Sequence, residues 1–330
     1  MIDKSRSPEP LTAHGGRIDL ATARFPDAPR PWVDLSTGIN PHGWDANGVP
    51  IAWGPLPDRT ALAELEAAAR SAFGMATGAI AALPGTEIGL RLLRDIGLPQ
   101  PRRYVTPSYP THAAALADSG PIAIDAIGPG GTTLLANPNN PDGGVIPPGH
   151  LIQIARTAGG GWLVVDEAFA DVDPGLSILP RLADDDRVLV FRSFGKIFGL
   201  AGLRLGFVCG PPAMIAQFRE RLGDWPVSAA AIAIGTAAYR DTDWIAAMRL
   251  RLVAAADRLD TLLRAHGFDP QGACPLFRLV CDDSSPRLFE RLGAAGILTR
   301  PFDYDPRWLR FGLPGAEADW VRLAEALDHG

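Results

Sequence analysis

Short apolar segments alternate with helical patterns over much of the chain, and this alternation constrains the fold more than any other feature. Residues 60–73 and 86–97 carry Ala, Leu and Ile at helical spacing. Apolar segments, most of them bounded by Gly, Pro or Asn as buried strands are, follow at 103–106, 122–127, 132–136, 162–166, 187–191 and 205–209. Helices between parallel strands predict an α/β fold, with a three-layer large domain built on a mainly parallel sheet.

A different pattern begins after Pro226. Two long helical patterns come first, at 228–239 and 243–266. A mixture of short strands and a helix follows, at 276–281, 285–295, 297–299 and 308–311, and then a final helix. This order is typical of an α+β layout. We therefore expect an N-terminal arm (residues 1–35), a large domain (residues 36–226) and a smaller α+β C-terminal domain (residues 227–330).

Composition narrows the class of protein. The formal net charge of -6 argues against a dedicated nucleic-acid binder, which normally has a basic face. No run of about 18 apolar residues is present, and the N-terminus lacks the basic and apolar stretches of a secretion signal. The 3 cysteines are too scattered for a disulfide framework or a zinc site. We expect a cytoplasmic protein with no metal site and no nucleic-acid or membrane partner.

Lys196 is unusual because the chain has only one other lysine, Lys4, among its 31 basic residues. Arginine evidently serves where a plain positive charge is needed, and a guanidinium does not deprotonate at any useful pH. A lysine amine, in contrast, can become neutral and nucleophilic when it is buried or crowded by charge. Lys196 is therefore a candidate for Schiff-base chemistry, with an ordinary ion pair as the alternative.

Polar residues also cluster where the predicted strands end, which is where open α/β sheets bind ligands. Gly85, Thr86 and Glu87 begin a predicted helix, whose free backbone N–H groups and threonine hydroxyl suit an anion such as phosphate. A simple helix cap by Thr86 is the alternative. The two Asn-Pro steps in residues 137–143 direct amide side chains into a cleft or form a tight loop without a ligand.

Asp166 ends a very apolar predicted strand, so its carboxylate requires a cation such as a protonated pyridine nitrogen, a magnesium ion or an arginine. Glu167 should point to the other side of the strand, which makes a metal site there a poor one. Further on, RSFGKIFGLAGLRLGF places Ser193 and Arg204 around Lys196. A hydroxyl and a guanidinium can bind a phosphate beside the amine, and the glycines allow close backbone approach.

Together these motifs resemble the fold-type I pyridoxal-phosphate enzymes, the aspartate-aminotransferase superfamily, over about residues 30–315. The resemblance implies pyridoxal 5'-phosphate as the cofactor, bound covalently by Lys196, with Asp166 at the ring nitrogen and the ring serving as an electron sink. Tyr109 stacks on the ring with His112 beneath it, and Lys196, Asp166 and Tyr109 are the implied catalytic residues. The other implied cofactor contacts are Gly85, Thr86, Glu87, Asn140, Ser193 and Arg204.

The same resemblance implies a set of substrate contacts. Arg310, in WLRFGLPG, matches the arginine that binds the substrate carboxylate, and Arg300, in GILTRPF, matches one near a substrate phosphate. Asn140 is expected to touch the substrate as well as the ring. His14 in HGGRID and Gly38 in DLSTGINP belong to N-terminal segments that fold over the substrate. The family forms homodimers, so a homodimer with sites at its interface is expected.

Within the superfamily the chain is more similar to the threonine-phosphate decarboxylases of cobalamin synthesis than to the histidinol-phosphate aminotransferases. The N-terminal segments favour the decarboxylases, as does Phe169, where aminotransferases usually carry a tyrosine that bonds the ring oxygen. One departure from the pattern is Leu56, where many relatives have a tyrosine that reaches the partner subunit's cofactor phosphate. Trp53 lies nearby in the sequence as a substitute contact.

The expected reaction is decarboxylation of O-phospho-L-threonine to (R)-1-amino-2-propanol O-phosphate. The alternative is a histidinol-phosphate-type aminotransferase, because the two reactions differ only in which Cα bond is aligned with the ring. That alignment amounts to a few kcal/mol of transition-state binding, roughly, which no motif encodes. A second alternative is a non-catalytic regulatory or scaffold protein, against which the intact Lys196, Asp166 and Arg310 argue.

Overall fold

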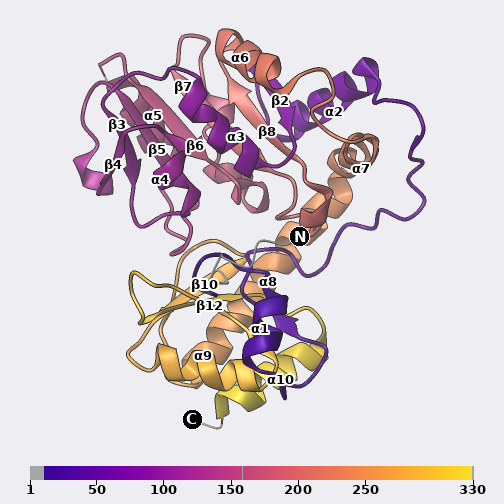
Figure 1. Ribbon diagram of the computed structural model, residues 1–330, viewed down its shortest axis with the longest axis vertical. Coiled ribbons are helices and arrows are strands. Elements are labelled where there is room, and N and C mark those ends of the chain that lie inside the picture. The colour runs from indigo at the N-terminus through magenta and orange to yellow at the C-terminus, as the bar shows by residue number, and fades with distance from the viewer. Residues whose placement is uncertain (1–10, 158, 329–330) are drawn as a thin grey trace, which may run out of the picture. The chain divides into compact units, whose positions relative to one another are not determined.

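The predicted parallel strands form one mixed sheet, as expected for an α/β fold. The computed structural model describes residues 11–157 and 159–328 of the chain. Within these residues, seven strands lie in the order β2-β8-β7-β6-β5-β3-β4 (Figure 1). Strand β8 runs antiparallel to both of its neighbours, and the other pairs are parallel. The strands are β2 (Ala79–Leu83), β3 (Arg102–Val105), β4 (Ser119–Ile122), β5 (Thr132–Ala136), β6 (Trp162–Asp166), β7 (Val188–Ser193) and β8 (Gly206–Gly210).

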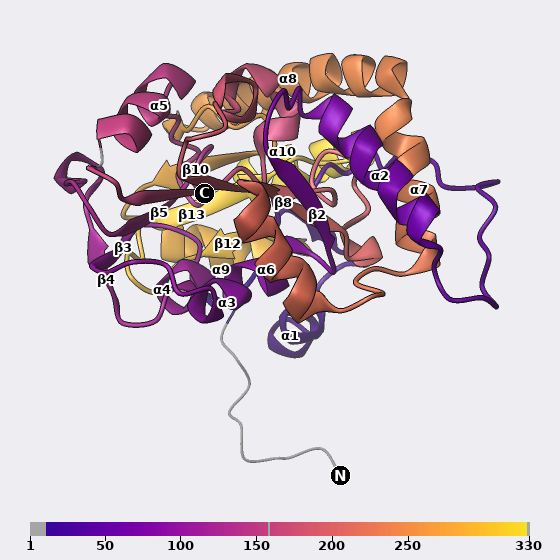
Figure 2. The ribbon, with the colours of Figure 1, turned by 90° about the horizontal axis from the view of Figure 1, so that it is seen from above.

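Helices cover both faces of this sheet, which confirms the predicted three-layer architecture. Figure 2 shows α2, α5 and α7 on one side and α3, α4 and α6 on the other. The helices of this part are α2 (Arg59–Ala72), α3 (Thr86–Leu92), α4 (Thr111–Ala115), α5 (Pro148–Thr157), α6 (Pro212–Leu222) and α7 (Ala229–Arg240), followed by residues 242–250 of α8 (Thr242–Ala265).

Apolar side chains of alternate strand positions hold α3, α4 and α6 against the sheet. Leu134, Val164 and Leu189 come from three adjacent strands and are all fully buried. Phe218 of α6 packs on the same cluster and contacts Phe191 edge-on, with 6.0 Å between ring centroids. Because side chains alternate across a strand, the residues between these positions face α2, α5 and α7.

The remaining elements form a separate unit with an antiparallel sheet of order β12-β13-β10-β9. A short parallel pair, β1 with β11, also lies in this unit. The strands are β1 (Val33–Asp34), β9 (Pro270–Gln271), β10 (Phe277–Cys281), β11 (Ile297–Leu298), β12 (Arg300–Pro301) and β13 (Trp308–Gly312). The helices are α1 (Ile18–Arg24), α9 (Ser285–Ala294), α10 (Glu317–Asp328) and residues 251–265 of α8.

The compact units divide the chain differently from the three expected parts. Of the described residues, 11–42 group with 251–328, and 43–250 form the other unit. The N-terminal segment joins the C-terminal part because β1 pairs with β11 and the Leu35 carbonyl accepts the Gly312 N–H at 2.7 Å. The division falls inside α8, between residues 250 and 251, rather than after residue 226 as expected.

Two strand predictions need correction. The segment 122–127 was expected to be a strand, but the strand is β4 and residues 124–126 form a 3-10 turn. Pro121 is tolerated in β4 because this strand lies at the sheet edge, where a missing N–H interrupts no second ladder. Strand β2 was not predicted at all, since its sequence AIAAL is dominated by alanine, a weak strand former.

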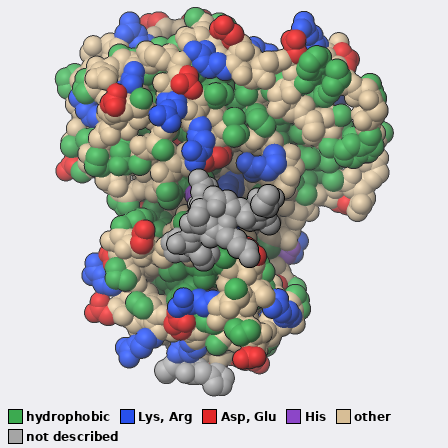
Figure 3. Space-filling view, in the orientation of Figure 1, with side chains coloured by type: hydrophobic (Ala, Val, Ile, Leu, Met, Phe, Trp, Pro, Cys, Tyr) green, Lys and Arg blue, Asp and Glu red, His purple; other side chains and the backbone are tan. Residues whose placement is uncertain are grey.

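The surface carries charges of both signs (Figure 3), and none of the described helices is a candidate membrane span. Figure 3 shows acidic and basic side chains interspersed over the face that it presents. Within residues 11–157 and 159–328, no helix is long and apolar enough to cross a membrane.

Replacement of Leu189 by alanine should destabilise the larger unit. The side chain is fully buried between strands and helices, so the cavity left behind should cost about 2–5 kcal/mol of unfolding free energy. Urea denaturation followed by circular dichroism measures this change. Ile124→Ala, at a position 43% exposed in the same unit, is the control and should shift the transition little. Equal shifts in the two variants would contradict the assigned core.

Candidate active site

The carboxyl ends of β2 and β7 meet the beginning of β8 at one edge of the sheet. Because β8 is antiparallel to both, Gly206 is the register partner of Leu83 and of Ser193. The residues after β2, at the end of β7 and before β8 therefore converge. We call Gly85, Thr86, Ser193 and Arg204 the strand-end cluster.

The close packing of the strand-end cluster requires glycine at Gly85 and at the adjacent Gly206. Gly85 has φ +88°, and a Cβ there would lie 2.5 Å from an Arg204 guanidinium nitrogen. A Cβ on Gly206 would lie 2.7 Å from the Thr86 backbone nitrogen. Arg204 itself has a left-handed backbone, with φ 56°. The bare backbones thus leave the hydroxyls, the N–H groups and the guanidinium close together, an arrangement suited to an anion.

Asp166 lies at the end of β6 and is 6% exposed. One carboxylate oxygen accepts the Ala168 N–H at 3.1 Å, and the other lies 3.1 Å from Nε2 of the fully buried His112. A carboxylate can only accept, so Nε2 of His112 carries the hydrogen. The resemblance implies that Tyr109 stacks on the cofactor ring with His112 beneath it. In the structure the His112 ring is bonded to Asp166 and lies edge-on to Tyr109.

Lys196 follows β7 in the tight SFGK turn, whose close packing depends on Gly195. A Cβ on Gly195 would lie 2.6 Å from the Ala201 Cα. The Lys196 amine lies 5.2 Å from the centroid of the Phe169 ring, which is buried. An ammonium at this distance from an aromatic face is attracted by the ring quadrupole. Phe169 thus provides an apolar wall without a hydroxyl beside the amine.

Asn140 reaches the same pocket from the loop after β5. The other asparagines of the loop hold it in place. The Asn137 side chain donates to the carbonyls of Ile146 and Leu176, and Asn139 donates to the Pro107 carbonyl at 3.0 Å. Of the amide side chains that the sequence predicted to enter a cleft, Asn140 lines the pocket. Asn137 and Asn139 instead stabilise a tight loop, which was the alternative prediction.

Tyr109 is held by Glu87. The phenol donates to a Glu87 carboxylate oxygen at 3.0 Å, and Thr111 donates to the same oxygen at 2.8 Å. Arg91 pairs with the other Glu87 oxygen at 2.7 Å. Burial, followed by the negative charge of Glu87, raises the pKa of Tyr109 to about 12. Glu87 lines the pocket, and its hydrogen bonds orient the tyrosine; the bond from Thr111 was not predicted from the sequence.

These residues surround one pocket in the larger unit. Nine predicted site residues line it: Gly85, Thr86, Glu87, Tyr109, Asn140, Asp166, Ser193, Lys196 and Arg204. The sequence had not selected several of the apolar or small lining residues, namely Ala136, Pro138, Ala168, Ala201 and Leu205. Such residues carry no chemical signal in a sequence, because only the fold brings them to the pocket. Trp53 and Leu56 lie on the surface of this unit, 77% and 66% exposed, and neither lines this pocket.

The predicted substrate residues other than Asn140 lie in the smaller unit. Arg300 and Arg310, the arginine pair, are register partners on β12 and β13 and are both buried. Arg300 donates to the Ala13 carbonyl at 2.7 Å, and Arg310 donates to the Ser36 carbonyl at 2.8 Å. Burial, and then the charge of Arg300, lower the pKa of Arg310 to about 10. Two buried guanidiniums on paired strands form a cationic site suited to anions.

The N-terminal segments that contain His14 and Gly38 pack against these strands. The Gly16 N–H donates to the Ser36 hydroxyl at 2.7 Å. A Cβ on Gly15 would lie 2.3 Å from the Ser36 carbonyl oxygen, so the two segments are in direct contact. His14 is partly buried and follows Ala13, whose carbonyl binds Arg300; Gly38 is buried two residues after Ser36.

The sequence matches the aminotransferase class I and II family over residues 128–327. Together with the strand-end cluster, Asp166 and Lys196 in one pocket, this defines the class of the protein: the chain belongs to the aminotransferase class I and II family.

Two similar sequences and one similar structure show which members of the family this chain resembles. The chain is 41% identical to the threonine-phosphate decarboxylase of Sinorhizobium sp, over 95% of this chain and 97% of that protein. It is 38% identical to the threonine-phosphate decarboxylase of Pseudomonas aeruginosa, over 96% and 97% of the two chains. The fold is similar to that of histidinol-phosphate aminotransferase from Sinorhizobium meliloti in complex with pyridoxal-5'-phosphate, with a TM-score of 0.77 and 20% identity over 94% of this chain and 93% of that one.

The raised pKa of Tyr109 predicts its titration. Because the folded pKa is about 12 against 10.0 for a free tyrosine, folding favours the protonated phenol. The resulting stabilisation is complete below pH 10 and is lost as the pH rises towards 12. The measurement is the difference in tyrosinate absorbance between the wild type and Tyr109→Phe as the pH is raised. We expect this difference to develop with a midpoint near 12. A midpoint near 10 would contradict the buried contact with Glu87.

Proposed function

We propose that the protein is a pyridoxal 5'-phosphate-dependent threonine-phosphate decarboxylase, which converts O-phospho-L-threonine to (R)-1-amino-2-propanol O-phosphate and CO2. The observation that carries this proposal is the similarity to two threonine-phosphate decarboxylases over nearly the whole chain. The product is a precursor of the cobalamin side chain, so the proposal includes a place in cobalamin biosynthesis.

The residues of the pocket fit this cofactor. The strand-end cluster, with Gly85 and the adjacent Gly206 at positions where a Cβ would collide, would accommodate the phosphate. Asp166 would pair with the ring nitrogen, and the bond from His112 holds Asp166 in place. Asn140 would bond the ring hydroxyl, Tyr109 would cover the ring face, and Lys196 would hold the cofactor covalently. When bound, the cofactor supplies an electron sink for the pair of electrons released at Cα.

Lys196 and Phe169 have the roles closest to the reacting atoms. Lys196 would hold the cofactor, and its free amine would deliver the proton that replaces the carboxylate on Cα. In the overall reaction one C–C bond breaks, CO2 leaves and one C–H bond forms at the same carbon. Phe169 beside the amine offers an apolar surface and no competing hydroxyl. Such a surface would keep water away from the amine during proton transfer.

The arginine pair supplies the charge that recognises the substrate. O-phospho-L-threonine carries a carboxylate and a phosphate, and two buried guanidiniums on adjacent strands offer forked donors to such groups. We assign the carboxylate to Arg310 and the phosphate to Arg300, with His14 and Gly38 in the segments packed beside them. The proposal also includes a homodimer located in the cytoplasm.

The test is CO2 release by purified, cofactor-loaded protein from O-phospho-L-threonine without a keto-acid acceptor. Sustained release over many turnovers is expected, since a transaminase stops after one half-reaction. Release limited to background, with amino transfer from histidinol phosphate, would replace the proposal by the aminotransferase. Absence of both reactions, with no spectral response to either substrate, would indicate the non-catalytic alternative.

The two lysines provide a matched pair of variants for this assay. Lys196→Ala should lower turnover by about 1000-fold or more, because it removes both the covalent attachment and the proton donor. Lys196→Arg should be similarly impaired, since a guanidinium cannot form the covalent bond at neutral pH. Lys4→Arg, at a position outside the described residues, should retain wild-type turnover. Wild-type activity in Lys196→Ala would contradict the assignment.

A further inference from the structure

The ends of β6 and β7 carry charged side chains on the sheet face opposite the pocket. Asp166 shares a strand face with Val164, and Ser193 shares one with Phe191. Glu167 and Arg192 alternate with them and therefore lie behind the sheet. The Glu167 N–H donates to the Phe191 carbonyl at 2.9 Å, so the two strands are still in register here. Glu167 was expected to point away from Asp166, and the structure confirms this.

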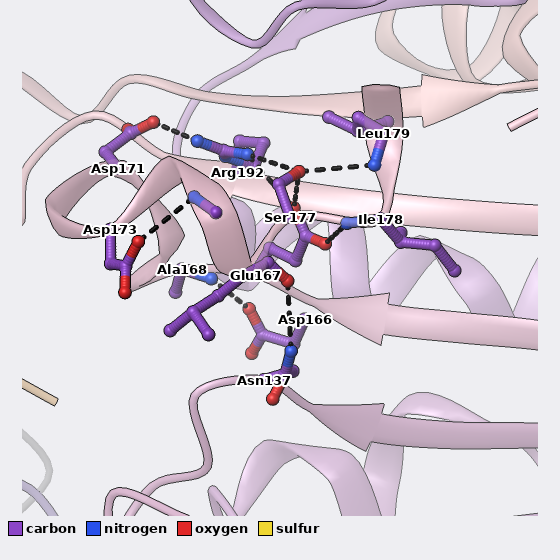
Figure 4. Close-up of polar contacts among 12 residues, drawn as sticks. Asn137, Asp166, Glu167, Ala168, Asp171, Asp173, Ser177, Ile178, Leu179 and Arg192 are labelled. Atoms are coloured by element: carbon purple, nitrogen blue, oxygen red, sulfur yellow. Dashed lines mark hydrogen bonds and ion pairs between the residues drawn. The ribbon is translucent and has the colours of Figure 1, made fainter. Parts of the chain in front are cut away.

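Arg192 joins Glu167 to two other residues behind the sheet (Figure 4). One guanidinium nitrogen donates to Glu167 and to the Ser177 hydroxyl, each at 3.0 Å, and another donates to Asp171. Ser177 in turn donates to Glu167 at 2.6 Å. All four side chains are buried, with Arg192 1% and Glu167 0% exposed. We call Glu167, Asp171, Ser177 and Arg192 the rear-face cluster.

The rear-face cluster fastens the loop that follows β6. Asp171 lies in the 3-10 turn Ala170–Val172, and Ser177 lies further along the same loop. Glu167 also accepts the Ile178 N–H at 2.7 Å. The loop is thus tied to Arg192 at three points, on both sides of Phe169. Arginine suits this task because its fork of donors reaches two carboxylates and a hydroxyl at once, whereas a lysine ammonium is a single compact charge.

Three residues that line the pocket lie within two residues of this cluster in the sequence. Asp166 precedes Glu167 by one residue, Phe169 lies between Glu167 and Asp171, and Ser193 follows Arg192 directly. Lys196 comes three residues after Ser193. Phe169 lies in the loop after β6 and Lys196 in the segment after β7, and Arg192 ties these two segments together. The 5.2 Å distance between the Lys196 amine and the Phe169 ring therefore depends on how the two segments are held.

We propose that Arg192, held by Glu167 and Asp171, is a positioning residue that sets the placement of Lys196, Phe169 and Asp166 around the cofactor. It acts from the opposite face of the sheet and touches neither cofactor nor substrate. This inference rests on the proposed function, because it concerns the residues assigned there to the cofactor.

The experiment compares Arg192→Gln, Arg192→Lys and Asp171→Asn with the wild type. Two properties are measured on each protein: the affinity of the apoprotein for pyridoxal 5'-phosphate, from fluorescence quenching, and the pH midpoint of the bound cofactor's visible absorbance change. Asp186→Asn is the matched control, since Asp186 is a buried carboxylate that pairs with Arg156 in the same unit and does not line the pocket.

Arg192→Gln should bind the cofactor about tenfold more weakly or worse and should shift the pH midpoint. Arg192→Lys should recover part of both properties, and Asp171→Asn should fall between the wild type and Arg192→Gln. Asp186→Asn should lower the thermal midpoint of the apoprotein without changing either cofactor property. This pattern separates positioning from general stability.

Two results would decide against the inference. Folded Arg192→Gln and Asp171→Asn with wild-type affinity and a wild-type pH midpoint would overturn the role of Arg192 and leave the proposed function standing. If Arg192→Gln does not fold, Asp171→Asn alone decides by the same criterion. A wild-type protein that binds no pyridoxal 5'-phosphate would overturn the proposed function itself, and the inference with it.

Discussion

The parallel pairing of β6 with β5 and β7 is the constraint on which the rest of the site depends. It brings the carboxyl ends of these strands to one edge, with Ala136 beside Asp166 and Asp166 beside Phe191. Asn140, Asp166 and Lys196 then lie within a few residues of neighbouring strand ends. Strand β8 runs the other way and returns Arg204 to the same edge. A single sheet edge thus assembles groups that are far apart in the sequence.

Buried charge has two distinct uses in this chain. In the larger unit, Arg192 is bonded to two carboxylates, so its charge is balanced and its fork serves to fix two chain segments. In the smaller unit, Arg300 and Arg310 lie opposite one another, and the first lowers the pKa of the second. Balanced charge of the first kind stabilises a geometry, whereas concentrated positive charge of the second kind is suited to an anionic substrate.

Much of the fold and pocket could be predicted because the signals are local. Strand endings at Ala136 and Asp166, the Gly-Thr turn and the isolated Lys196 each follow from a few adjacent residues. The alternation rule also placed Glu167 behind the sheet. The bond between His112 and Asp166 could not be predicted, since 54 residues separate them and only α4 packing on the sheet joins them. The bonds of Arg192 to Asp171 and Ser177 depend equally on tertiary packing.

The most direct test of the account is to locate the cofactor on the chain. The loaded protein is reduced with borohydride, digested, and its peptides are analysed by mass spectrometry. Because the chain has two lysines, the result has few possible forms. The account predicts a pyridoxyl group on the peptide that contains Lys196 and an unmodified Lys4. A modification on Lys4 alone, or on neither lysine, would contradict the central claim that Lys196 and its pocket bind the cofactor.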